Sequence, residues 1–99
     1  MKKDLLEIID EIVALLTKCN LREKANWFRI KAKRLKGLEQ NSKEYKDELL
    51  EIKSIIAGMG SFSDLPMYPK KGSGLSEEEA SNKQWDLAAK LGEAISKSL

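Results

Sequence analysis

Apolar residues recur at three- and four-residue spacing in four separate segments of this chain, and this periodicity constrains its fold most strongly. The spacing is that of one face of an α-helix, so each segment predicts an amphipathic helix. The predicted helices cover residues 4–18, 21–36, 42–57 and the stretch from 77 onwards. Because 99 residues is the length of one small domain, we expect residues 1–99 to form a single all-α domain, a small four-helix bundle.

Residues that commonly begin or end helices stand at the borders of these segments. Asn20 is a candidate both to end the first helix and to cap the second. Asn41 or Ser42 is the candidate start of the third helix, and Ser76 with Glu79 forms a capping box before the fourth. Gly37 and Gly58 follow the second and third helices. We expect both glycines to end their helices in the left-handed conformation.

Residues 58–74 have no helical period and hold both prolines and four of the six glycines. We therefore expect a structured Gly/Pro-rich loop between the third and fourth helices; loops this long are often functional. Its first half, 58–65, is either a structural turn or a surface for a partner. Its second half, 65–71, is a proline-stiffened aromatic segment that either anchors an interface or packs across the bundle.

The composition excludes several kinds of chemistry. The chain has no histidine, so histidine-based catalysis and histidine metal ligation are excluded. Its single cysteine, Cys19, cannot form an internal disulfide or a cysteine zinc site, and we expect it to be a buried or half-buried thiol. No spacing of carboxylates indicates a catalytic pair, so we expect no catalytic residue, no metal, no cofactor and no enzymatic activity. A small enzyme with a polar pocket at the loop is a rival interpretation.

The net charge is only +2, but five basic residues gather in the second helix: Arg29, Lys31, Lys33, Arg34 and Lys36. Such a basic stripe could bind phosphates, and a small nucleic-acid-binding or regulatory protein is therefore the alternative function. The apolar residues between them are spaced for burial, so the stripe is better explained as a solvated helix face. We interpret Trp27 and Trp85 as core or groove residues rather than base-stacking platforms.

No signal peptide or membrane-spanning segment is evident in the sequence. Acidic residues interrupt the N-terminal apolar stretch, and no apolar run approaches the roughly 18 residues that a spanning helix needs. Together with the unpaired cysteine, this predicts a cytoplasmic protein without membrane contact.

The segment Gly58-Met59-Gly60-Ser61-Phe62-Ser63-Asp64-Leu65 resembles a family of small helical bacterial proteins with a Gly-Met-Gly-Ser-x-x-Asp motif. Trp27 is similar to the tryptophan that its members carry in the second helix, and Asn82 to an asparagine that opens their last helix. Some members resemble immunity proteins of contact-dependent growth inhibition and other polymorphic toxin systems. The resemblance implies a protein that binds a cognate secreted toxin domain and neutralises it by covering its active site. It also implies that the motif residues, namely Trp27, Gly58, Met59, Gly60, Ser61, Asp64 and Asn82, serve mainly as scaffold.

A toxin-facing surface is predicted at the start of the fourth helix and in the loop before it. If the toxin is a nuclease, an acidic patch would face its basic cleft. We expect the chain to be a monomer alone or in a heterodimer with the toxin. The candidate partner-binding residues are Met67, Tyr68, Glu77, Glu78, Glu79 and Asp86.

Overall fold

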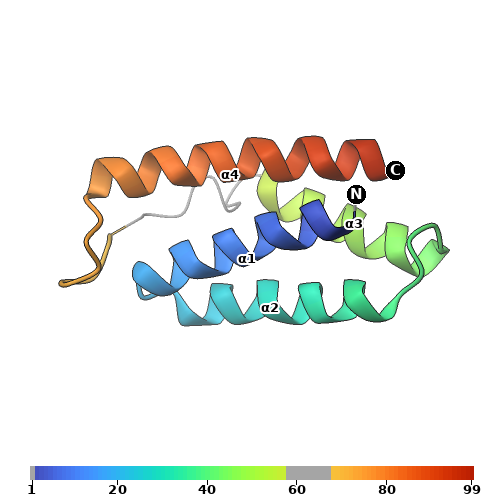
Figure 1. The fold of residues 1–99 in the computed structure, drawn as a ribbon, viewed down its shortest axis with the longest axis horizontal. Coiled ribbons are helices and arrows are strands. Elements are labelled where there is room, and N and C mark those ends of the chain that lie inside the picture. Colours follow the sequence, from blue (N-terminus) through green and yellow to red (C-terminus); the bar gives the residue numbers. More distant parts are fainter. Residues whose placement is uncertain (1, 58–67) are drawn as a thin grey trace.

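Each of the four segments with apolar periodicity forms an α-helix, as predicted. A computed structural model describes residues 2–57 and 68–99. The helices are α1 (Lys2–Lys18), α2 (Arg22–Gly37), α3 (Lys43–Ala57) and α4 (Glu77–Ser98) (Figure 1). No strand occurs in the described ranges, and the all-α fold class is confirmed.

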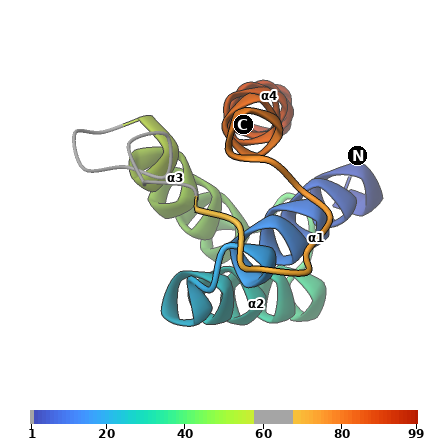
Figure 2. The ribbon, with the colours of Figure 1, turned by 90° about the vertical axis from the view of Figure 1, so that its left-hand side faces the viewer.

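The helices form an elongated up-down-up-down bundle, with extents of 42 × 22 × 20 Å. Each helix runs opposite to the one before it (Figure 1). The view along the bundle shows α1 between α2 and α4, while α3 completes the ring by packing on α2 and α4 (Figure 2). The contact between α2 and α3 is the least extensive of the four.

The core is made by the apolar stripes that the sequence predicts. In α1 the fully buried side chains of Leu5, Ile9, Ile12 and Leu16 recur at spacings of four, three and four. Each fully buried leucine or isoleucine contributes about 1.5–3 kcal/mol through removal of apolar surface from water. The other three helices contribute matching stripes: Ala25, Phe28, Ala32 and Leu35 from α2, Tyr45, Leu49, Ile52 and Ile56 from α3, and Ala80, Leu87, Leu91 and Ile95 from α4.

Asn20 ends α1, as predicted, but it does not also cap α2. Its φ is +61°, in the left-handed region. The Asn20 N–H donates to the Thr17 carbonyl at 3.1 Å, and the Leu21 N–H to the Leu16 carbonyl at 2.9 Å, which is the Schellman pattern. Asparagine tolerates this backbone conformation better than most residues with a Cβ. The residue at the N-cap of α2 is therefore Leu21, whose side chain makes no capping hydrogen bond.

The other helix ends confirm the serine caps and correct the role of Gly37. The Tyr45 N–H donates to Ser42 Oγ at 3.1 Å, and the Glu79 N–H donates to Ser76 Oγ at 3.1 Å. Gly37 is the last helical residue of α2 and lies outside the positive-φ region, while Leu38 leaves the helix in an extended conformation (φ −106°, ψ 148°). The helix ends there without a left-handed glycine. Gly58 lies outside the described residues.

The described part of the predicted loop, residues 68–74, crosses the end of the bundle and is attached to α1. The Lys70 N–H donates to the carbonyl of Lys18 at 2.8 Å, which satisfies one of the free carbonyls at the end of α1. A turn follows, closed by the Ser73 N–H and the Lys70 carbonyl at 3.1 Å. Gly72 takes a φ of +87° within it, a conformation that favours glycine.

Candidate functional site

The N-terminal half of α4 carries most of the described candidate residues. Ser76 caps the helix, and Glu77, Glu78 and Glu79 form its exposed first turn. Their negative charge is favourable beside the positive end of the helix dipole. This gives the three acids a structural role in addition to any role in binding.

Trp85 is exposed, and the interpretation of this residue as a core or groove side chain is wrong. Its exposed fraction is 62%. The buried positions of α4 are Ala80, Gln84, Leu87, Leu91 and Ile95. Each residue of a helix turns by about 100°, so Trp85, one position after Gln84, points away from the core. An indole this exposed contributes little to the fold, and tryptophan is the residue type most enriched at binding hot spots.

Both ion pairs within α4 lie on the flank of the helix that faces α1. Asp86 pairs with Lys90 at 3.0 Å, and Glu93 with Lys97 at 3.1 Å, both one turn apart. Hydrogen bonding to Asp86, together with the charges of Asp86 and Glu11, raises the pKa of Lys90 despite a small opposing effect of burial. Together with Lys83, the Asp86–Lys90 pair lines a hollow of about 210 Å³ between α1 and α4. Asp86 therefore lies on the side of α4 that faces α1, whereas Glu78 and Trp85 lie on another side of the helix.

Tyr68 is the second exposed aromatic residue of the candidate set. It is 65% exposed and lies two residues before Lys70, where the loop is attached to α1. Tyr68 itself is therefore exposed to solvent, while the backbone that follows it packs across the end of α1. Met67, the neighbouring candidate, lies outside the described residues.

The motif residues that the structure describes are Trp27 and Asn82. Trp27 is half-buried on α2 and contacts the ring of Phe28 edge-on, with 5.0 Å between the ring centroids. Asn82 is exposed in the second turn of α4, not at its opening position. Gly58, Met59, Gly60, Ser61 and Asp64 lie outside the described residues, so the motif's loop remains a prediction.

The basic stripe of α2 is not a uniformly solvated face, because Lys31 is buried. Only 4% of Lys31 is exposed, and its Nζ lies 2.8 Å from Glu48 Oε2 and 2.8 Å from Glu51 Oε2, both on α3. The same ammonium group lies 5.3 Å from the centre of the Trp27 ring. Arg34 binds the other Glu48 oxygen, Oε1, at 2.9 Å. We call Lys31, Arg34, Glu48 and Glu51 the α2–α3 clasp.

The pKa values in the clasp follow from these contacts. Burial of Lys31 favours its neutral form, but hydrogen bonds and charges from Glu48 and Glu51 together outweigh it and raise the lysine pKa. The hydrogen bond and charge of Lys31, with a smaller contribution from Arg34, lower the pKa of Glu51. Both shifts favour the charged forms of Lys31 and Glu51 at neutral pH, and the clasp is structural.

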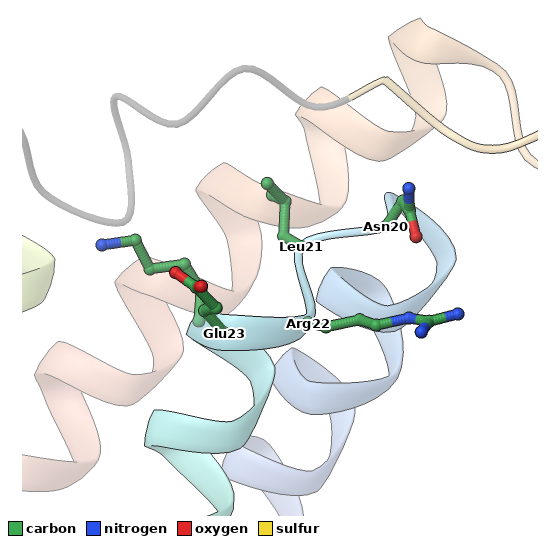
Figure 3. A pocket seen from close by; sticks show the side chains of 5 residues that line it. Asn20, Leu21, Arg22 and Glu23 are labelled. Atoms are coloured by element: carbon green, nitrogen blue, oxygen red, sulfur yellow. The ribbon is translucent and has the colours of Figure 1, made fainter.

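A further hollow of about 600 Å³ lies at the start of α2, lined by residues 20–24. The labelled side chains fan out from the turn and do not converge on a common point (Figure 3). It is formed by one short connection of the chain and has none of the convergent polar groups of a ligand pocket.

Residues 2–57 and 68–99 contain no group of three or more His, Cys, Asp or Glu side chains arranged to hold a metal ion. None of the described helices is long and apolar enough to span a bilayer.

No protein-family model matches this sequence, and neither a curated protein nor a solved structure matches it.

Proposed function

We propose that this chain is an immunity protein, which binds the toxic domain of a secreted bacterial protein and blocks its active site by covering it. The observation that carries the proposal is Trp85, 62% exposed on a helix whose first turn is Glu77, Glu78 and Glu79. Tryptophan is enriched at the binding hot spots of protein interfaces, and acids beside it favour a partner surface that is basic.

The resemblance of residues 58–65 to the motif of small bacterial immunity-like proteins supports the same proposal from the sequence. So does the exposure of Tyr68 on the loop that leads into α4. Acidic and aromatic side chains together would speed the encounter with a basic cleft and then anchor the complex. The cleft of a nuclease toxin would have this character.

In this proposal the chain acts by binding alone, without catalysis or a cofactor, in the cytoplasm. It is a monomer that forms a heterodimer with the toxin. Cys19 is compatible with a reducing compartment, because it is buried and burial raises its thiol pKa, which disfavours the reactive thiolate.

The alternative, a nucleic-acid-binding protein that uses the stripe of α2, receives less support. Lys31 and Arg34 are two of its five basic residues, and both are engaged by carboxylates of α3. A lysine or arginine that is already paired with a carboxylate releases fewer counterions when it binds a phosphate. The stripe should therefore bind phosphates more weakly than its five basic residues suggest.

Two experiments test the proposal. The tagged chain is used to capture partners from its host, and the gene immediately upstream is sequenced. The C-terminal domain encoded by that gene is then expressed alone and together with this chain. Growth arrest that the chain relieves, with a 1:1 complex in solution, is the expected result. Recovery of nucleic acid without a protein partner, with binding that weakens steeply as salt rises, would contradict the proposal.

A further inference from the structure

Four exposed residues form a stripe along α4: Glu78, Asn82, Trp85 and Ala89. Their spacings of four, three and four place them on one face of the helix. The groove between α1 and α4 takes Lys83, Asp86 and Lys90 from α4, so the stripe lies on another flank. We call these four residues the Trp85 stripe.

All the lysines of α4 lie away from this stripe. Lys83, Lys90 and Lys97 recur every seven residues, each four positions after an acid: Glu79, Asp86 and Glu93. Two of these three acid–lysine pairs form ion pairs at 3.0 and 3.1 Å. Glu78 has no such lysine, because the residue four positions on is Asn82. Glu78 forms no ion pair with residues 2–57 and 68–99. The stripe therefore holds this carboxylate and an exposed indole, and none of its four residues is basic.

This arrangement selects a partner by its charge. An indole attracts a cation placed over its ring, most favourably a guanidinium group, and a carboxylate attracts a second cation. The Cα atoms of Glu78 and Trp85 are seven residues apart on the helix, about 10 Å at 1.5 Å per residue. Two cations about 10 Å apart would therefore engage both groups at once.

We propose that the Trp85 stripe binds a basic face of a protein partner that carries two arginine or lysine side chains about 10 Å apart. One side chain stacks on Trp85 and the other pairs with Glu78, while Asn82 and Ala89 complete the contact. This inference deepens the proposed function, since it identifies the surface and the kind of toxin face that it would cover.

The test uses the whole chain and a defined probe, a 16-residue helical peptide with two arginines seven positions apart on an alanine–glutamine background. A control peptide has glutamine at both arginine positions. Binding is followed by ¹H–¹⁵N correlation spectra, in which the exposed Trp85 indole N–H reports separately from the half-buried Trp27. We expect saturable shifts centred on Trp85 and residues 78–89, with the arginine peptide at least tenfold tighter than the control.

Three variants assign the contact to the stripe. W85A is expected to weaken binding about tenfold and E78Q about threefold. I30A is the matched control and should leave binding unchanged, because Ile30 is 51% exposed on α2, a helix that does not pack on α4. Thermal unfolding should confirm that all three variants keep the fold, since each side chain is exposed. Binding of W85A equal to wild type, shifts centred elsewhere, or no difference between the two peptides would overturn the inference.

The failure of this inference can be distinguished from failure of the proposed function. If the upstream toxin domain is neutralised equally well by wild type and W85A, the stripe is not the toxin-binding surface, and immunity stands. If the peptide binds at Trp85 as expected but no toxin is bound, the stripe stands and immunity fails.

Discussion

Replacing Lys31 with methionine should show how much the α2–α3 clasp contributes to the stability of the bundle. Methionine keeps most of the volume of the lysine stem and removes only the charge and the hydrogen-bond donors. Loss of one partner of a fully buried ion pair costs about 3–5 kcal/mol. The cost here should be smaller, because 54% of the Glu51 side chain is exposed and can regain water, while Glu48 keeps Arg34 at 2.9 Å.

We therefore expect K31M to lower the free energy of unfolding by about 2 kcal/mol, well below the full penalty for a buried pair. In a domain of this size that corresponds to a melting temperature lower by about 10 °C. Urea unfolding followed by circular dichroism at 222 nm measures the free energy directly. K33M is the matched control, since Lys33 is exposed on the same helix, and it should change stability by no more than about 0.5 kcal/mol.

The stability difference between wild type and K31M should depend on pH, and this dependence tests whether the ion pairs of Lys31 cause it. Lys31 lowers the pKa of Glu51 below its ordinary value of 4.5, so this contribution is present above that pH and is lost as pH falls through the folded-state pKa. The pKa of Lys31 is raised above 10.5, so the contribution of the lysine is present below that pH and is lost as pH rises through its folded-state pKa. The difference in free energy of unfolding should be constant between about pH 5 and 10 and should become smaller below and above this range. A K31M variant as stable as K33M, or a difference that does not change with pH, would refute this account of the clasp.

Three further substitutions test the helix ends. G37A should raise stability by about 0.5 kcal/mol, because Gly37 is helical and a Cβ there meets nothing within 4 Å; a loss of stability would indicate a left-handed conformation at this residue. N20A should lower the free energy of unfolding by about 1 kcal/mol, because alanine tolerates a φ of +61° less well than asparagine, whereas N20G should not lower it. Equal effects of the two variants in urea unfolding would contradict the Schellman turn. S76A should cost about 1 kcal/mol through loss of the hydrogen bond from the Glu79 N–H. S76D, which keeps a capping oxygen, is its control in the same thermal melts and should retain the wild-type stability.

The bundle could be predicted from the sequence because the apolar pattern that specifies each helix is local and is repeated along the helix. Each helix carries four or more apolar residues at helical spacing, so a mistake at one position leaves the face unchanged. The serine caps are similarly local, since the side chain and the N–H that it accepts from are three residues apart. The prediction is wrong in two details of the helix ends: Asn20 does not also cap α2, and Gly37 ends α2 without a left-handed conformation. Such details depend on the fold around the helix end, for example on Leu21 packing against the core.

Lys31 and Trp85 show why the surface could not be predicted as reliably as the core. Lys31 stands at helical spacing between Phe28 and Leu35, a position that would be apolar in a simple stripe, and this was a signal of its burial. Its burial is tolerated only because Glu48 and Glu51, 17 and 20 positions later, face it across the bundle. No local rule links positions so far apart. Trp85 lies one position outside the buried stripe of α4, and because single exposed apolar side chains are common on protein surfaces, the helical pattern alone assigns it no role. The buried positions can be predicted from each helix by itself. The roles of these two residues depend on a neighbour, which is α3 for Lys31 and, in our proposal, a toxin for Trp85.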